Sequence, residues 1–116
     1  MNSSNFKQGD IVVLDLKYSD GSGSKLRPVL VVSGVKFNKS SDRIVVKISG
    51  TNHGFEWEIP LENGDLVEGK LKKRSFVDCG FITTIDIRRI RRKIARINNE
   101  ALERILKKIK EILEKA

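Results

Sequence analysis

The sequence RPVLVVS, residues Arg27–Ser33, decides the fold that we expect for this chain. It sets a charged residue and a rigid proline before an unbroken apolar run, and a glycine- and serine-rich segment, residues 19–25, precedes it. A short apolar run bounded by turn residues is typical of a buried strand, and proline fits the first residue of a strand. We therefore predict that Arg27 lies at the mouth of a strand. On these residues alone, a solvated surface charge is the commoner role for such an arginine, and a working group beside a flexible loop is the alternative.

Further strands are predicted on both sides of this stretch. Residues 11–16 are almost continuously apolar and should form a central strand, which a long loop at residues 17–25 joins to a strand at residues 29–33. A polar connection follows at residues 34–42, with Phe37 as its anchor. The other predicted elements are strands at residues 43–49, 66–67, 75–77, 81–84 and 92–97, and one helical or 3₁₀ turn at residues 86–90.

Residues 55–59, FEWEI, alternate strictly between apolar and acidic side chains. This period of two predicts a strand with its two aromatic rings and Ile59 on one face. Glu56 and Glu58 then form a solvated face rather than an acid–base pair. Pro60 either ends this strand or places it at a sheet edge.

The period changes after residue 97. Apolar residues recur at steps of three and four from Ala101 to Leu113, which predicts an amphipathic helix at residues 98–115 that Asn98 or Asn99 caps. We expect this helix to pack across the end of the sheet, although part of its apolar stripe can instead serve a dimer. Short strands with one terminal helix favour a mainly β fold, a small curved barrel. The expected organisation is a single domain, residues 1–116, with a flexible N-terminus at residues 1–8.

Composition limits the classes to which the chain can belong. Its 116 residues suffice for one modest core. A single cysteine, Cys79, excludes an internal disulfide and fits a reducing compartment. No apolar run is long enough to span a bilayer, and the first residues lack the apolar region of a secretory signal. We therefore expect a cytoplasmic protein with no membrane partner.

Positive charge is concentrated in one part of the chain. The formal net charge is +8, and residues 70–96 contain ten basic and two acidic residues, so this segment alone equals the excess of the whole chain. A clustered positive field attracts polyanions such as nucleic acid or an acidic protein segment. Charges kept only for solubility are normally mixed in sign, so we expect a polyanionic partner.

Several kinds of chemistry are excluded by the residue types present. One cysteine and one histidine cannot make a four-ligand zinc site, and neither a phosphate-binding glycine loop nor a G-x-S-x-G elbow occurs. We therefore expect no metal and no cofactor. His53 has the one side chain whose ordinary pKa lies near neutrality, and it can be catalytic or a solvated loop residue. Cys79 reads as a small buried apolar residue rather than a nucleophile.

The order of these segments resembles the MazF/PemK toxins of toxin–antitoxin pairs. The resemblance rests on Gly9-Asp10-Ile11-Val12, a glycine-rich loop, Arg27–Val32, a strand ending in Ile48-Ser49, Thr84-Ile85-Asp86 and a C-terminal amphipathic helix. It extends from about Gly9 to Leu113. It implies an SH3-like barrel of the kind shared with the toxin CcdB, and a homodimer.

The resemblance also implies an activity, which is metal-independent cleavage of single-stranded RNA by attack of the 2′-hydroxyl on the adjacent phosphate. The family's catalytic arginine corresponds to Arg27 and its threonine or serine to Ser49. A cognate antitoxin with an acidic tail is the implied protein partner. For RNA binding we expect Lys25, Thr51 and His53, together with Lys72, Lys73 and Arg74 of the basic segment at residues 70–96.

The sequence departs from the family pattern at residues 78–83. Many members carry arginine, aspartate and glutamine just before the Thr-Ile-Asp motif, where this chain has DCGFIT. The loop before Arg27 also lacks the usual glutamate and glutamine. The alternative function is therefore a non-catalytic module on the same barrel that binds RNA, DNA or an acidic protein. Trp57, Tyr18 and Phe81 are its candidates for stacking on bases.

Overall fold

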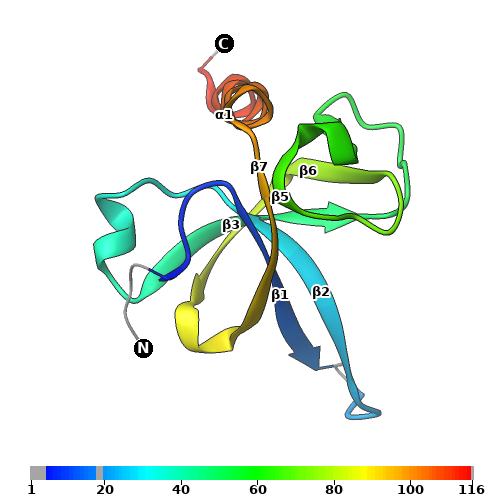
Figure 1. Ribbon diagram of the computed structural model, residues 1–116, viewed down its shortest axis with the longest axis vertical. Helices are drawn as coiled ribbons and strands as arrows, with labels where there is room; N and C mark the ends of the chain where they lie inside the picture. The colour runs from blue at the N-terminus through cyan, green and yellow to red at the C-terminus, as the bar shows by residue number, and fades with distance from the viewer. Residues whose placement is uncertain (1–4, 18–19, 116) are drawn as a thin grey trace.

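The computed structural model describes residues 5–17 and 20–115 and has the expected mainly β architecture (Figure 1). All strand pairs are antiparallel, and the sheet order is β4-β6-β3-β2-β1-β7-β5. The strands are β1 (Asp10–Lys17), β2 (Ser24–Val31), β3 (Asp42–Ser49), β4 (Glu58–Leu61), β5 (Leu66–Gly69), β6 (Ser75–Asp86) and β7 (Ile90–Ile97). Short 3₁₀ turns lie at η2 (Phe37–Lys39), η3 (Asn63–Asp65) and η4 (Ile87–Arg89), and α1 (Asn99–Leu113) ends the chain.

The sheet curls because its two outermost strands are joined by a very short link. β4 and β5 lie at opposite ends of the strand order, yet only residues 62–65 connect them. An extended link of that length spans at most about 17 Å. The two ends of the sheet are therefore drawn together into a half-barrel, which confirms the predicted curved fold.

Both faces of the central strands are buried, which explains their continuous apolar sequences. One cluster lies between the sheet and α1 and includes Ile11, Leu30, Val46, Val77, Ala101 and Ile105. The other lies on the opposite face and includes Phe6, Val12, Leu14, Val31, Val45 and Ile90. Neighbouring residues of one strand, such as Ile11 and Val12, thus enter different clusters, as the alternation of side chains along a strand requires.

Arg27 lies inside β2, so the prediction that it stands at the mouth of a strand is wrong. It pairs with Leu14 of β1, and the hairpin continues to the pair Lys17–Ser24. The position of Pro28 in the strand explains why it is tolerated. Val32 donates its N–H to the Ile44 carbonyl of β3, and backbone groups two and four residues away point to the same side, so the nitrogen of Pro28 also faces β3. Pairing with β3 ends at Val29, so the missing N–H of Pro28 costs no ladder bond. The expected loop shortens to residues 18–23, of which 18 and 19 lie outside the described residues.

Three other local predictions are corrected. Phe37 is exposed, and the buried anchor of its connection is Asn38, whose side-chain amide donates to the Ser33 carbonyl at 2.8 Å. The strands predicted at residues 75–77 and 81–84 are one continuous strand, β6. The strand predicted at residues 55–59 begins only at Glu58, which is buried rather than solvated. Pro60 does lie in an edge strand, because β4 is outermost in the sheet.

α1 packs against β6 and β4, as expected for a helix across the end of the sheet. Asn98 caps it, accepting a hydrogen bond from the Ala101 N–H at 2.9 Å. Within the segment expected to be flexible, Phe6 is buried and the Gln8 side chain donates to the Val32 carbonyl at 2.8 Å. Within the described residues, no helix combines the length and apolarity that a membrane span needs.

Candidate nucleic-acid interface and catalytic site

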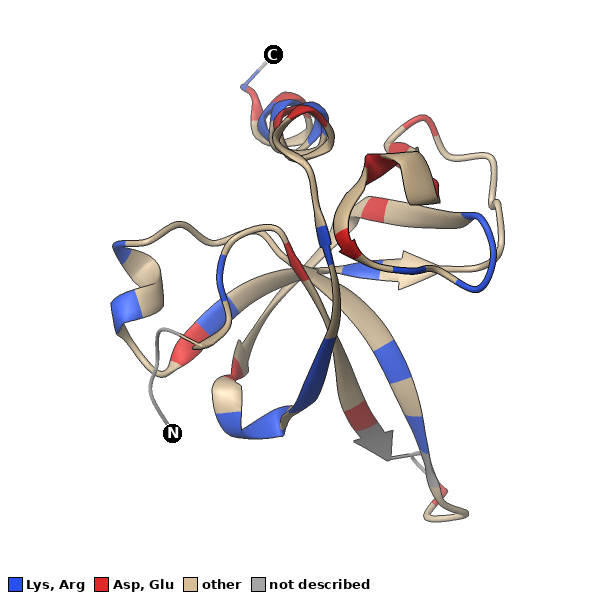
Figure 2. Ribbon diagram, viewed as in Figure 1, with Lys and Arg blue, Asp and Glu red and all other residues tan. Residues whose placement is uncertain are grey.

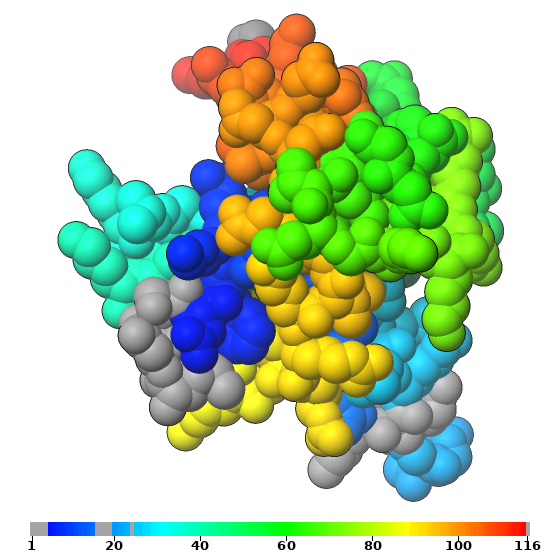
Figure 3. All heavy atoms as spheres, in the orientation of Figure 1, coloured from blue at the N-terminus to red at the C-terminus, as the bar shows by residue number. Residues whose placement is uncertain are grey.

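A groove of about 560 Å³ is formed by β2, the end of β3, the segment before β6, and β7. These segments meet on the face shown in Figure 3, where β2 is light blue, β7 gold and the segment before β6 green. We call this hollow the basic groove. Its charged lining residues are all basic and come from three separate parts of the chain: Lys25, Arg27, Lys70, Lys72, Lys73 and Arg92.

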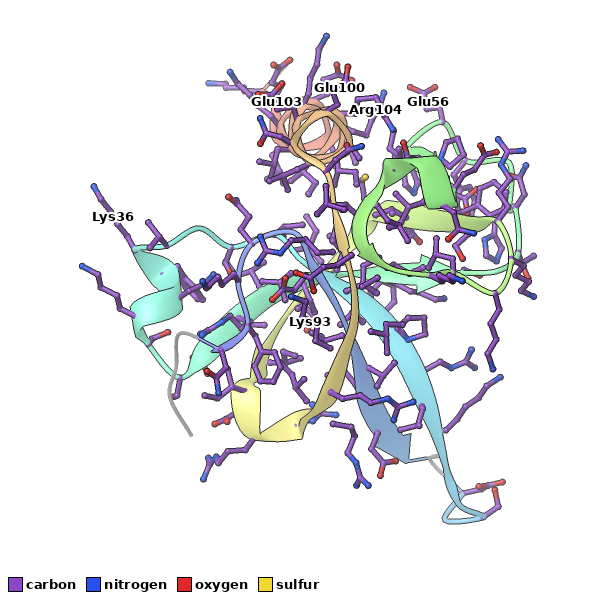
Figure 4. The ribbon with its side chains drawn as sticks, viewed as in Figure 1. Lys36, Glu56, Lys93, Glu100, Glu103 and Arg104 are labelled. Atoms are coloured by element: carbon purple, nitrogen blue, oxygen red, sulfur yellow. The ribbon has the colours of Figure 1, made fainter. Side chains whose placement is uncertain are left out.

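In the part of the chain that the structure describes, the cations of the basic groove form no ion pair, whereas the other basic residues of the 70–96 segment, except Arg89, are paired. Among the described residues, none of the six lies in an ion pair or donates a side-chain hydrogen bond. Outside the groove, Arg91 pairs with Asp15, and Lys93, labelled in Figure 4, lies 2.9 Å from Glu68. Figure 2 shows the blue bands of β2, β7 and the segment before β6 bordering one region. The unpaired charge is thus concentrated where the surface is hollow, as a polyanion site requires.

Arg27 and Ser49 are brought together by strand register. β2 pairs with β3 through Val29–Lys47, Leu30–Val46 and Val31–Val45. Continuing this antiparallel register by two residues sets Arg27 opposite Ser49, just beyond the point where the two strands stop pairing. Both residues line the basic groove. A guanidinium and a hydroxyl thus face one concave, cationic surface.

The hydroxyl of Ser49 is oriented by the backbone that follows it. The Ser49 Oγ accepts a hydrogen bond from the Thr51 N–H at 3.1 Å. Because that bond uses a lone pair of the oxygen, the hydroxyl hydrogen remains available to donate. The pair Arg27 and Ser49 can therefore supply forked charged donors and one neutral donor to an anion in the groove.

The wall that carries Lys70, Lys72 and Lys73 is pinned at both ends. Asn63 exchanges two hydrogen bonds with the Leu71 backbone, accepting from its N–H at 2.7 Å and donating to its carbonyl at 3.3 Å. Ser75, a buried residue, donates its hydroxyl to the Lys73 carbonyl at 3.2 Å. The lysines thus extend from a backbone that is already positioned, so less ordering is needed on binding.

Three of the expected RNA-binding residues are not in the groove lining. Thr51 and His53 lie in the exposed loop after β3. Arg74 lies 3.1 Å from Glu62 and over the ring of Phe76. The structure therefore brings together Lys25, Lys72 and Lys73 with the two expected catalytic residues, and leaves the other three outside the groove lining.

His53 is tied to a buried carboxylate. Its Nδ1 lies 2.9 Å from Glu58 Oε2, and Glu58 Oε1 accepts the backbone N–H groups of His53 and Phe55. Burial alone would raise the pKa of Glu58, but these hydrogen bonds outweigh it and lower the pKa below its ordinary value. The rings of His53, Phe55 and Trp57 stack in sequence, with centroid distances of 5.6 and 4.8 Å. Glu58 thus fixes the conformation of the loop before β4 through these hydrogen bonds. The alternation of residues 55–59 had instead predicted a solvated Glu58.

Residues 79–81, in the run where the sequence departs from the family pattern, form a bulge in β6. Val46 pairs with Ile82 and Lys47 with Asp78, so residues 79–81 have no partner in β3. Cys79 turns into the core, and burial raises the pKa of its thiol to about 12, as expected for a structural cysteine rather than a nucleophile. Phe81 is 53% exposed and approaches Lys47, whose ammonium lies 5.4 Å from its ring centroid.

An apolar depression of about 280 Å³ adjoins the basic groove, with Arg27 and Pro28 bordering both. Its walls include Leu14, Val29 and Phe81. Two further apolar side chains, Leu26 and Ile82, are exposed on β2 and β6, the strands that also carry Val29 and Phe81.

The described residues hold no group of three or more His, Cys, Asp or Glu side chains that could bind a metal ion.

Lys70 and Arg92 line the groove but were not expected among the RNA-binding residues. Arg92 lies between Arg91 and Lys93 in β7, and those two neighbours pair with Asp15 and Asp10. The period of two in a strand was the available signal for Lys93 and Arg92, which it sets on opposite faces, whereas a register shift between Ile90 and Arg92 interrupts the alternation at Arg91. Lys70 carried no comparable signal, because the curl of the sheet brings its segment to β2.

Comparison with solved structures shows the same fold in several toxins. The chain is similar to MazF in a MazE–MazF complex from Deinococcus radiodurans, with a TM-score of 0.75, 20% identity and coverage of 92% of this chain and 94% of that one. It is similar to an endoribonuclease from a mycobacterial species, with a TM-score of 0.73, 16% identity and coverage of 92% and 89%. The Mycobacterium tuberculosis toxin MazF-mt6 gives a TM-score of 0.65 at 23% identity, with coverage of 86% and 93%.

The sequence itself identifies the family. No curated protein matches the chain significantly. The model of one family, described as PemK-like, MazF-like toxin of type II toxin–antitoxin system, matches residues 7–113. That match covers the barrel, the basic groove and the whole of α1. The chain therefore belongs to the PemK-like, MazF-like toxins of type II toxin–antitoxin systems.

Proposed function

We propose that this toxin is an endoribonuclease that cuts single-stranded RNA without a metal ion. The observation that carries the proposal is the basic groove, in which Arg27 and Ser49 lie among five further unpaired cations and no carboxylate of the described residues. The 2′-hydroxyl attacks the adjacent phosphorus, the bond from phosphorus to the 5′-oxygen breaks, and a 2′,3′-cyclic phosphate forms. The proton lost by the 2′-hydroxyl is balanced by the one that the leaving 5′-oxygen gains, so the step consumes no water.

Arg27 and Ser49 act on the charge of the transition state. The pentacoordinate phosphorane carries more negative charge than the phosphodiester, and donors aimed at its oxygens stabilise it more than the ground state. Arginine stays protonated in proteins, so Arg27 stabilises charge rather than serving as a base. Removing one such donor costs about a hundred- to a thousand-fold in rate.

The remaining predicted residues bind the RNA strand on both sides of the cleavage point. Lys25, Lys72 and Lys73 neutralise phosphates inside the groove. Thr51, His53 and Arg74, outside the groove lining, contact more distant nucleotides. An RNA substrate and a single cysteine, which cannot form an internal disulfide, support a cytoplasmic location for this single-domain protein.

The same groove accepts the antitoxin. A segment of this partner that is extended and acidic matches a concave surface whose charged residues are all basic, and it competes with RNA for that surface. One of the similar structures is a complex of MazE with MazF. Binding of antitoxin and cleavage of RNA are therefore mutually exclusive.

A second copy of the chain covers the apolar depression beside Arg27. The exposed side chains of Leu26, Phe81 and Ile82 lie on β2 and β6, the strands that border it. Apolar surface of this kind marks an association site. In the resulting homodimer, two basic grooves lie beside the shared interface.

The test is incubation of the purified protein with long single-stranded RNA in EDTA. Wild type yields discrete fragments with 5′-hydroxyl ends, and Arg27→Ala, which keeps the same circular dichroism spectrum, yields none. Lys36→Ala is the control, because Lys36 is exposed on the far side of the molecule, next to η2 (Figure 4), and its loss leaves the fragments unchanged. Equal cleavage by wild type and Arg27→Ala would reject the assignment of Arg27.

The second candidate function is a non-catalytic module that binds RNA, DNA or an acidic protein through the same groove. It is favoured by the bulge at residues 79–81, where family members carry polar groups and this chain exposes Phe81. Tight, salt-sensitive binding with intact RNA in every sequence tried is the result that would select it.

A further inference from the structure

Gly50 leaves space that the side chain of Lys73 occupies. A Cβ added at Gly50 would lie 2.6 Å from Lys73 Nζ and would also collide with Lys73 Cε. The backbone of Gly50 does not need glycine, because its φ is not in the left-handed region. The three nearest atoms that a side chain at this position would meet all belong to the Lys73 side chain. The ammonium of Lys73 is therefore held against the residue that directly follows Ser49.

Lys73 reaches this position from a fixed backbone and carries an unneutralised charge. Its carbonyl accepts the hydroxyl of the buried Ser75. No carboxylate of the described residues pairs with it, and no acidic residue lines the groove. Lys73 is exposed and has no counter-ion among the described residues, and a cation of this kind in a hollow that also contains Arg27 is suited to an anionic ligand.

We propose that Lys73 binds a non-bridging oxygen of the scissile phosphate beside Ser49, and so acts in cleavage itself rather than only in holding the RNA strand. The inference rests on the proposed ribonuclease function and adds a third group to Arg27 and Ser49. Lys73 stays protonated and stabilises the extra charge of the phosphorane, while Ser49 donates its hydroxyl hydrogen to the same phosphate. Gly50 is a positioning residue, since it acts only by leaving the space in which the ammonium lies.

Gly50→Ala provides a test that moves the charge without removing it. The atoms nearest to the added methyl belong to the far end of the flexible Lys73 side chain, so we expect the fold to be retained and the ammonium to be pushed away from Gly50. A misplacement of about 1 Å can cost up to about a hundred-fold in rate. Gly64→Ala is the matched control, because Gly64 is an exposed glycine with nothing within 4 Å of an added Cβ.

The experiment measures single-turnover cleavage in EDTA and, separately, the affinity for a 2′-O-methyl RNA that cannot be cut. We expect Lys73→Ala to lose about a hundred-fold in rate and also to bind more weakly. Gly50→Ala should lose about ten- to a hundred-fold in rate, with a smaller loss of affinity, since its charge remains. The double variant should be no slower than Lys73→Ala, because the methyl has nothing left to displace.

The outcomes separate this inference from the function on which it rests. If wild type cuts RNA and Gly50→Ala cuts at the wild-type rate, or if the two rate losses multiply in the double variant, the role of Lys73 is refuted and the ribonuclease stands. If wild type cuts no RNA under any condition tried, the proposed function falls, and the role of Lys73 falls with it.

Discussion

The salt dependence of RNA binding can be calculated from the cations of the basic groove. Each phosphate neutralised on a single strand contributes about −0.7 to the slope of log affinity against log salt concentration. If all six unpaired groove cations contact phosphates, the slope is about −4, and affinity falls about 300-fold between 50 and 200 mM salt. The assay is fluorescence anisotropy with an uncleavable 2′-O-methyl RNA across that salt range.

Substitution of one groove cation tests whether these residues are the ones involved. Arg92→Ala should reduce the magnitude of the slope by about 0.7. Arg88→Ala is the control of equal charge, because Arg88 lies outside the groove and its guanidinium is bound to Asp86 at 2.9 and 3.1 Å. A wild-type slope shallower than about −2, or an equal effect of both substitutions, would refute the placement of RNA in the groove.

Three further predictions concern stability and reactivity. Cys79, whose thiol is buried with a pKa of about 12, should resist iodoacetamide at pH 8 until the chain unfolds, and rapid labelling of the native protein would contradict its burial. The pKa of Glu58 is lowered in the folded state, so ionised Glu58 stabilises the fold above the ordinary carboxyl pKa, and this stabilisation is lost as the pH falls through the folded-state pKa. Thermal melts from pH 7 to 3 should therefore show a steeper fall of the melting temperature for wild type than for Glu58→Gln. Gly69→Ala should lower the melting temperature strongly, because Gly69 has φ +77° and an added Cβ would collide with the Ile94 carbonyl, whereas an unchanged melting curve would show that the β5–β7 contact can relax.

The sequence predicted the elements whose signal is local. The apolar runs of β1 and β3 and the helical stripe after residue 97 appear where they were expected, because burial on both faces of a strand or on one face of a helix leaves a clear period. Arg27 was assigned correctly to the second strand region but wrongly to its end, since the extent of a hairpin depends on pairing with β1 and not on composition.

Features that depend on distant contacts were not predictable in this way. The alternation of residues 55–59 matched a strand, yet Glu58 is buried because it accepts two backbone N–H groups and binds His53. Among the cations, Lys25, Lys72 and Lys73 were expected to bind RNA, but their position around Arg27, together with Lys70 and Arg92, arises only because the sheet curls. Arg27 and Ser49 lie opposite each other only because β2 pairs with β3 in this register, and the sequence of a single segment does not specify that pairing.

The segment that carries Lys70, Lys72 and Lys73 follows β5, a short strand at the edge of the sheet. β5 contains four residues and pairs with β7 alone, and the lysine segment follows it directly. Amides of such a strand exchange with solvent through local opening that leaves the rest of the structure intact. An excursion that detaches β5 and also breaks the hydrogen bonds of Leu71 with Asn63 and of Lys73 with Ser75 separates Lys73 from Gly50 and removes three positive charges from the hollow, while Arg27 stays fixed in the centre of the sheet. Hydrogen exchange in β5 and at Leu71 therefore reports how often the lysine segment is displaced while the rest of the chain stays folded, and a bound polyanion should slow that exchange in proportion to its occupancy.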